Sequence, residues 1–250
     1  RQIEEDPGNP MPHHYLGTSY LSRGMMREAI EESVKAIDLA NRQNDDDPLY
    51  LWSRHNAAMA FFGLGNLDKA REYSLDALKI YPDHLDSHYT LAMVAAERSE
   101  WNDVIHYGNR FLELREIFEN NPERAGLVIN STTNEAPAVH LLVGHAYHDL
   151  GEAEKMEEEY QAAASVAEKP WEVWWNAGCF HLDRSGDLGQ AERFLEAARR
   201  QAPEQQEVWY MLAKLNNKRG REDDEKSCLE RLWNLGGDDV VVLNRHAALC

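Results

Sequence analysis

The sequence contains eleven histidines, and two of them are spaced so that they could bind a metal ion. His145 and His148 are three residues apart on a predicted helix, which puts both imidazoles on one face. A stable metal site needs a third and a fourth ligand, and the spacing of the surrounding residues predicts neither. We therefore predict that the chain holds no metal and that both rings line a surface of the first helix of their repeat.

The run Asp45-Asp46-Asp47 is a second candidate, because it satisfies the DxD pattern with which many glycosyltransferases bind a metal and a sugar nucleotide. No strand is predicted before it, so the run fits a solvated loop between helices better than a catalytic site. A Gly-rich phosphate loop, a nucleophile elbow and an HExxH motif are all missing from the sequence. The sequence thus predicts a chain that is not an enzyme by itself and that uses no cofactor.

The charge of the chain restricts its partners. It carries 44 Asp and Glu against 26 Lys and Arg, a formal net charge of −18. This charge repels nucleic acid and favours neutral or basic proteins and peptides. No apolar run reaches the roughly 18 residues of a membrane span.

Three cysteines, Cys179, Cys228 and Cys250, are widely spaced and lack the pattern of a zinc site. They indicate reduced thiols and a cytoplasmic location. Because the chain begins at Arg1 rather than Met, we interpret it as an excised portion of a longer protein.

Small residues in the middle of apolar helical patterns recur along the chain at nearly constant intervals. They are Gly17, Ala58, Ala92, Gly144, Cys179, Ala213 and Ala247, at intervals of 41, 34, 52, 35, 34 and 34. A second set repeats the first five of these intervals: Ala36, Ala77, Phe111, Ala163, Ala198 and Leu232. Against a period of 34, about seven extra residues follow the first repeat and about eighteen follow the third. Each period predicts two helices that approach closely at their small residues.

This pattern resembles the tetratricopeptide repeat (TPR), most clearly at Ala58, Gly65, Ala70 and Pro82 of the second repeat. The resemblance implies an all-α fold, a right-handed superhelix (α-solenoid) of about six helix pairs. A terminal capping helix, or a seventh repeat cut short, would follow them. The expected bounds are a single array over 1–250 with repeats at 10–44, 51–84, 85–118, 137–170, 172–205 and 206–239, an insertion at 119–136 and the terminal helix at 239–250.

TPR arrays bind a peptide or a partner's helix in a concave groove that the first helix of each pair forms. The repeat register transfers this role to His14, Thr18, His55, Met59, Tyr89, Met93, His145, His148, Asn176, Phe180, Tyr210 and Lys214. A lining rich in Met, His and aromatic residues suits a moderately apolar peptide. Only Asn56 matches the residues with which chaperone-tail binders of this family clamp a carboxylate, so that role is not expected.

The order of the segments is also similar to the TPR tail that follows the catalytic domain in some bacterial family-2 glycosyltransferases. The similarity lies in a polar opening segment, a stretched link after the first repeat and a long insertion before the array resumes. It implies a non-catalytic region that positions a partner or an acceptor. The alternatives are a part of an active glycosyltransferase whose catalytic domain lies outside this chain, and a free-standing TPR scaffold.

The insertion itself divides into two predicted parts. Apolar residues keep a helical pattern from Asn102 through Ile117, so the second helix of the third repeat should end at Asn120 or shortly after it. The apolar run Leu127-Val128-Ile129 should then fold back on the array, and a disordered spacer is the alternative.

Most of the tryptophans are predicted to pack in the core, as large aromatic residues do in TPR helices. The segment "PWEVWW" at 170–175 is different, because one helix cannot bury three indoles on one face. At least one of Trp171, Trp174 and Trp175 should therefore be partly exposed.

Overall fold

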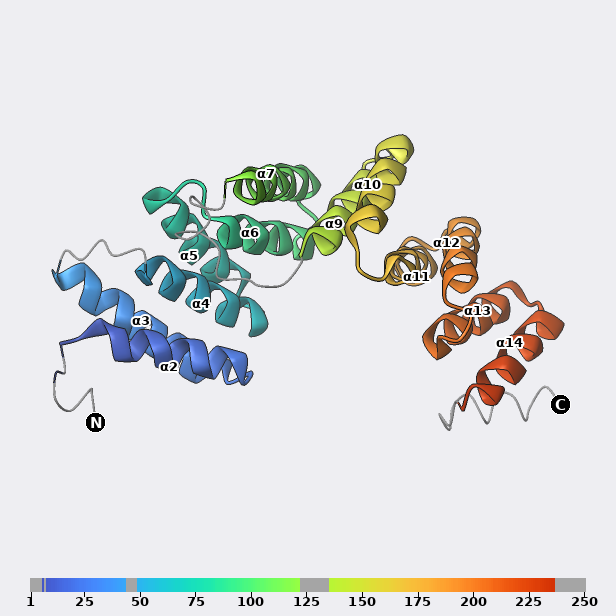
Figure 1. Ribbon diagram of the computed structural model, residues 1–250, viewed down its shortest axis with the longest axis horizontal. Coiled ribbons are helices and arrows are strands. Elements are labelled where there is room, and N and C mark those ends of the chain that lie inside the picture. The colour runs from blue at the N-terminus through green and yellow to red at the C-terminus, as the bar shows by residue number, and fades with distance from the viewer. Residues whose placement is uncertain (1–5, 7, 44–48, 122–134, 237–250) are drawn as a thin grey trace. The chain divides into compact units, whose positions relative to one another are not determined.

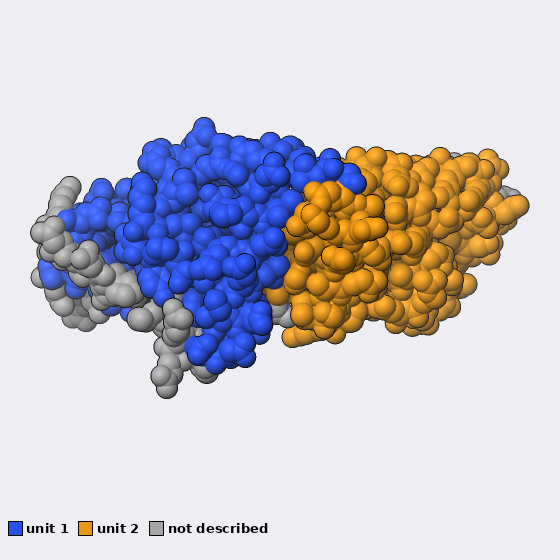
Figure 2. Space-filling model, turned by 90° about the horizontal axis from the view of Figure 1, so that it is seen from above, with its two compact units in different colours: residues 1–134, 149–151 blue, residues 135–148, 152–250 orange. Residues whose placement is uncertain are grey.

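The computed structural model describes residue 6 and residues 8–43, 49–121 and 135–236. Three predictions therefore fall outside the described residues: the loop at Asp45-Asp46-Asp47, the packing of Leu127-Val128-Ile129 and the terminal helix at 239–250. The chain divides into two compact units, unit 1 (residues 1–134 and 149–151) and unit 2 (residues 135–148 and 152–250) (Figure 2). We describe each unit by itself.

Unit 1 consists of three helix pairs, and a short turn joins the two helices of each pair (Figure 1). Its helices are α2 (Pro10–Ser22), α3 (Met26–Gln43), α4 (Leu49–Gly63), α5 (Leu67–Ile80), α6 (Leu85–Glu97) and α7 (Trp101–Asn120). The end of α7 at Asn120 confirms the extended second helix predicted for the third repeat.

Unit 2 contains three further pairs, and a short π-helical turn follows the first helix of the second pair. Its elements are α9 (Ala136–Asp149), α10 (Ala153–Val166), α11 (Pro170–Phe180), η1 (His181–Ser185), α12 (Leu188–Gln201), α13 (Gln206–Arg219) and α14 (Glu222–Asn234). The described residues form no strand, and the predicted all-α fold of packed helix pairs is confirmed. No described helix has the length and apolar character that crossing a membrane requires.

Small residues bring the two helices of a pair into close contact, as their regular spacing predicted. A Cβ atom added at Gly17 would lie 2.5 Å from the Ser33 Oγ, and one added at Gly144 would lie 2.6 Å from the Tyr160 ring. Atoms this close would overlap, so neither site has room for even one methyl group. In α11 the close contact is at Gly178, where an added Cβ atom would lie 2.6 Å from the Leu195 side chain, whereas Cys179 is only half-buried. The landmark of that repeat is therefore one residue earlier than predicted.

The turn between α6 and α7 shows how strictly the repeat geometry is kept. Ser99 has a φ of 57°, a left-handed conformation that costs a serine more than a glycine. Glycines occupy the corresponding turns elsewhere, for example Gly220 with a φ of 68°. Ser99 thus takes the place of the turn glycine, as the sequence pattern predicted.

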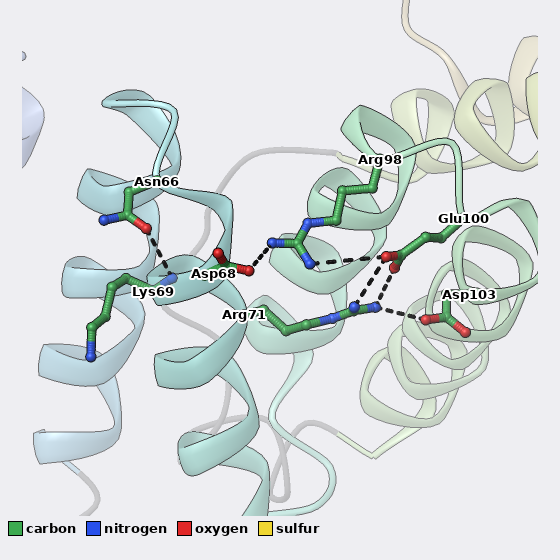
Figure 3. A network of polar contacts seen from close by, with 7 residues as sticks. All are labelled: Asn66, Asp68, Lys69, Arg71, Arg98, Glu100 and Asp103. Carbon is green, nitrogen blue, oxygen red and sulfur yellow. Dashed lines mark hydrogen bonds and ion pairs between the residues drawn. The ribbon is translucent and has the colours of Figure 1, made fainter.

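A network of ion pairs joins the start of α5 to the turn between α6 and α7 (Figure 3). Arg71 lies 2.5 Å from Glu100 and 2.7 Å from Asp103, and Arg98 pairs with Asp68. Since these residues come from successive helix pairs, the network connects the second pair of unit 1 to the third.

Unit 2 has the same connection with the charges exchanged. The positions 121 residues after Arg71 and Glu100 are Glu192 and Arg221, which form an ion pair of 2.7 Å. Arg219, at the position that corresponds to Arg98, also pairs with Glu192. These two contacts between neighbouring pairs therefore use the same positions with opposite polarity.

Only one of the tryptophans that were predicted to pack in the core is buried. Trp174 is buried, and Trp171 and Trp175 are half-buried, which confirms partial exposure in this segment. Core packing was the wrong prediction for Trp233, because 55% of that residue is exposed. It lies near the end of α14 on a face that no described helix covers.

We expect Arg71→Glu to lower the free energy of unfolding by about 1 kcal/mol, since it puts a carboxylate beside Glu100 and Asp103. Adding Glu100→Arg should restore most of the loss, because the double variant reproduces the polarity of unit 2. Urea unfolding measures both effects, with Arg27→Glu as the control for the change of charge, because Arg27 is exposed and forms no ion pair with another described residue. If the losses of the two single variants simply add, the two side chains are not coupled.

Candidate peptide-binding surface

The first helices of successive pairs in unit 1 are joined by hydrogen bonds between their side chains. Asn56 on α4 donates its amide N–H to the Thr18 hydroxyl on α2 at 2.8 Å. The Thr90 hydroxyl on α6 donates to the Asp86 carbonyl of its own helix at 2.9 Å and lies 3.5 Å from the Met59 sulfur on α4. These contacts hold α2, α4 and α6 side by side, and we call their surface the first-helix wall of unit 1.

Two of the predicted binding residues of unit 1 lie within this contact rather than on its surface. His14 is only 3% exposed, and its Nδ1 is hydrogen-bonded to the Ser53 hydroxyl at 2.9 Å. The Thr18 hydroxyl donates to the His14 carbonyl and accepts from Asn56. Their polar groups therefore join helices, which leaves little of them to contact a partner.

The other four predicted residues of unit 1 are half-buried and keep accessible surface: His55, Met59, Tyr89 and Met93. The Tyr89 ring packs against Phe111 of α7 with a centroid distance of 5.8 Å. The His55 ring lies 6.2 Å from that of His84. Burial, with a smaller contribution from His55, lowers the pKa of His84 to about 4, so this ring is neutral at pH 7.

In unit 2, the predicted residues His145 and His148 surround Phe180. The His145 ring lies flat against the Phe180 ring, with centroids 3.8 Å apart and planes at 7°. The His148 ring stands perpendicular to Phe180 at 5.4 Å and to His181 at 4.7 Å. Phe180 is only 8% exposed, so it forms the base of this cluster.

The histidine cluster is packed as an apolar group. The Nε2 atom of His145 is buried and has no hydrogen-bond partner among the described residues, and the same is true of the Nε2 atom of His181. Burial is the largest cause that lowers the pKa of His145 to about 3 and that of His181 to about 4. Within the described parts of the chain, no three His, Cys, Asp or Glu side chains gather as metal ligands would.

The remaining predicted residues lie on α11 and α13, whose surface we call the first-helix wall of unit 2. Tyr210 is 42% exposed, Asn176 is also exposed, and Lys214 is half-buried. The indole N–H of Trp175 donates to the Glu207 carbonyl at 3.3 Å and so connects the two helices. These contacts lie within unit 2.

Sequence reasoning missed two charged residues here, Lys218 on the wall and Asp183 in η1 beside it. Lys214 pairs with Asp183 at 2.7 Å, and the Lys218 ammonium donates to the Leu182 carbonyl at 2.8 Å. The sequence could have indicated Lys218, because it follows Lys214 by one helical turn and so lies on the same helix face. The repeat register predicts only two binding positions per repeat, and Lys218 lies one turn beyond them.

The buried imidazoles should make the protein sensitive to acid. An unfolded histidine binds a proton below about pH 6.5, whereas folded His145, His181 and His84 resist protonation until pH 3–4. Each therefore stabilises the fold above pH 6.5, and this stabilisation is lost by about 1.4 kcal/mol per pH unit as the pH falls toward 4.

We expect His145→Phe to reduce the slope of unfolding free energy against pH between 6.5 and 4 by about one proton's equivalent. Phenylalanine keeps the stack on Phe180 and removes a buried nitrogen without a partner. His106→Phe, at an exposed position, is the control. Chemical denaturation at a series of pH values gives the slopes, and an unchanged slope in His145→Phe would contradict the assignment.

Two stretches of the chain match known family models. Residues 11–83 match a model described as tetratricopeptide repeat, and residues 137–170 match a second model with the same description. No curated protein matches the sequence.

Several solved structures share the fold at low sequence identity. A tetratricopeptide repeat protein from Parabacteroides merdae is 14% identical, with a TM-score of 0.60 over 99% of this chain and 88% of that one. PilW, a widely conserved type IV pilus biogenesis factor, is 14% identical, with a TM-score of 0.64 over 94% of this chain and 97% of its own. A chain of the APC/C hetero-tetramer Cut9-Hcn1 is 14% identical, with a TM-score of 0.61 over 99% of this chain and 44% of its own.

Identities of this size show the fold alone. None of these descriptions names a glycosyltransferase, so they give no support to the resemblance to glycosyltransferase tails. Residues 11–83 and 137–170 are thus tetratricopeptide repeats, and the described chain has the all-α fold of TPR structures.

Proposed function

We propose that the chain is a non-catalytic interaction module that binds an extended peptide segment of a partner protein on its first-helix walls. The observation that carries this proposal is the set of side-chain contacts between first helices in unit 1: the hydrogen bonds of Asn56 with Thr18 and of His14 with Ser53, and the contact of Thr90 with Met59. They fix neighbouring first helices at one spacing, so the side chains beyond them form a preorganised surface.

The composition of the unit 1 wall indicates the kind of peptide. Met59 and Met93 offer flexible, polarizable side chains, and Tyr89 adds an aromatic surface backed by Phe111. Such a surface accepts apolar side chains of varied shape. The net charge of −18 favours a neutral or basic segment over an acidic one.

The unit 2 wall adds polar contacts to this scheme. Tyr210 presents an exposed phenol, and Asn176 donates one amide N–H to the Glu172 carbonyl and keeps its oxygen exposed. Both can hydrogen-bond to a peptide backbone. Lys214 is already paired with Asp183, so it contributes less free charge than the sequence alone suggested.

Within this proposal, the twelve predicted residues divide into two groups. His14, Thr18, His145 and Phe180 hold the walls in place through internal contacts. The other eight would contact the peptide, and they are His55, Met59, Tyr89, Met93, His148, Asn176, Tyr210 and Lys214.

The proposed link to a bacterial glycosyltransferase, as its tail or as part of the active enzyme, rests on segment order in the sequence. A cytoplasmic location is likewise a proposal from the sequence, and it rests on the spacing of the cysteines. The full-length gene would decide the first point, since a preceding α/β domain with a strand-borne DxD motif would support it.

Selection of a random peptide library on the full chain should enrich neutral or basic peptides with two or more apolar residues. The double variant Met59→Glu with Tyr210→Glu should weaken binding of a selected peptide at least about tenfold, because each change puts a charge on a wall. Phe180→Glu is unsuitable, because Phe180 is buried against His145. Fluorescence polarisation measures the affinity.

The control is Leu75→Glu, which changes an exposed apolar residue on the second helix α5. It should bind the peptide as the unmodified chain does. Equal affinities in the double variant and the unmodified chain would place the binding site elsewhere.

A further inference from the structure

A pocket of about 270 Å³ lies in unit 2 between the second helices α10 and α12. Glu157 and Gln161 line it from α10, and Arg193, Ala197 and Arg200 line it from α12. The spacing of four, four and three residues puts each set on one helix face. Apart from Trp174 on the first helix α11, the lining comes from second helices, and none of the residues predicted to contact a peptide on the first-helix walls lines the pocket.

The floor of the pocket is aromatic. Trp174 of α11 stacks on Phe194 of α12, with centroids 5.9 Å apart and planes at 8°. The Arg193 guanidinium lies 4.4 Å from the Phe194 centroid and pairs with Glu157. One of the two arginines of the pocket is therefore neutralised within the chain.

The second arginine is not neutralised in this way. Arg200 is exposed and makes no ion pair or hydrogen bond with another described residue. At the corresponding positions of unit 1, 121 residues earlier, Lys79 pairs with Asp76 at 2.7 Å. Ala197 stands in unit 2 where unit 1 has Asp76. Without a carboxylate at residue 197, the Arg200 guanidinium has no ion pair among the described residues, and the pocket beside it stays open.

We propose that this pocket binds an acidic segment of a partner protein, with one Asp or Glu carboxylate on Arg200 and an adjacent aromatic or apolar side chain on the Trp174–Phe194 floor. The volume is below the roughly 300 Å³ at which small-molecule sites begin and is enough for one large side chain. Charge complementarity selects the occupant, because a carboxylate replaces the one that Asp76 supplies in unit 1. Exposed Gln201 at the rim can bond to the segment's backbone.

This site does not depend on the first-helix walls. The walls suit a neutral or basic segment, and the pocket suits an acidic one. A chain with both would hold two segments of opposite charge at once, on different helices. A peptide selected on the walls should therefore not compete for the pocket.

The first test uses small probes on the full chain. In ¹H–¹⁵N spectra, 3-phenylpropionate should shift the Trp174 indole N–H and the Arg200 Nε–H in a saturable way. The neutral isostere 3-phenylpropanamide should bind at least about fivefold more weakly, since it cannot form the charged pair. Shifts confined to other residues, or equal binding of the acid and the amide, would overturn the assignment of Arg200.

Two variants of the pocket and one matched control make the test specific. Ala197→Asp restores the acid that unit 1 has at residue 76 and should weaken the probe about tenfold by pairing with Arg200. Arg200→Gln should weaken it to the same degree. Lys79→Gln, at the corresponding position of unit 1, should leave it unchanged. An unaltered affinity in Ala197→Asp with a native circular dichroism spectrum would contradict the proposal.

A peptide distinguishes a partner protein from a free small anion. The acetylated peptide Ser-Glu-Phe-Glu-Ser should bind several-fold more tightly than 3-phenylpropionate, and its glutamine counterpart should bind more weakly than the acidic peptide. Both effects should disappear in Ala197→Asp. The proposal is wrong if inorganic phosphate or the free acid binds as tightly as the acidic peptide, or if the peptide shows no binding at millimolar concentration.

Discussion

The close approach of paired helices at their small residues is the constraint on which the rest of this structure depends. Gly17 and Gly144 face atoms that leave no room for a methyl group, and Ala58 and Ala92 are fully buried. Each helix therefore packs against its own partner at a fixed position along its axis. Because that position recurs along the chain, the residues a few places away recur on the same outer faces.

Two outer faces with different chemistry follow from this arrangement. First helices are joined through polar side chains, such as Asn56 and Thr18, and they expose Met, His and Tyr residues. Second helices are joined through charged residues, and the exchanged polarity of Arg71 with Glu100 and Glu192 with Arg221 shows that charge is adjusted pair by pair. The pocket lies beside Arg200, whose guanidinium has no ion pair among the described residues, whereas Lys79 at the same position of unit 1 pairs with Asp76 on its own helix.

The sequence predicted the helices well, because the determinants of each pair are local. Intervals of 34 between small residues located the pairs, and Ser99 was correctly assigned to a turn that elsewhere contains glycine. The candidate surface was predicted less completely. Register places His14, His145 and Phe180 on the first-helix face, but the neighbouring helix decides which of them stay accessible. The prediction that Trp233 packs in the core was wrong for the same reason, because no described neighbouring helix covers it. The role of Arg200 could not be predicted from its own repeat. It becomes visible only when the repeats are compared, because unit 1 has Asp76 where unit 2 has Ala197.

The central claim is that the first-helix walls form the recognition surface, and methionine oxidation tests it most directly. Met59 and Met93 lie on the wall of unit 1, whereas Met25 is exposed in the turn before α3. Mass spectrometry after brief peroxide treatment reports the oxidation rate of each. With a selected peptide bound, the rates at Met59 and Met93 should fall several-fold and the rate at Met25 should stay the same. Equal rates with and without the peptide at all three positions, or protection of Met25 alone, would contradict the account.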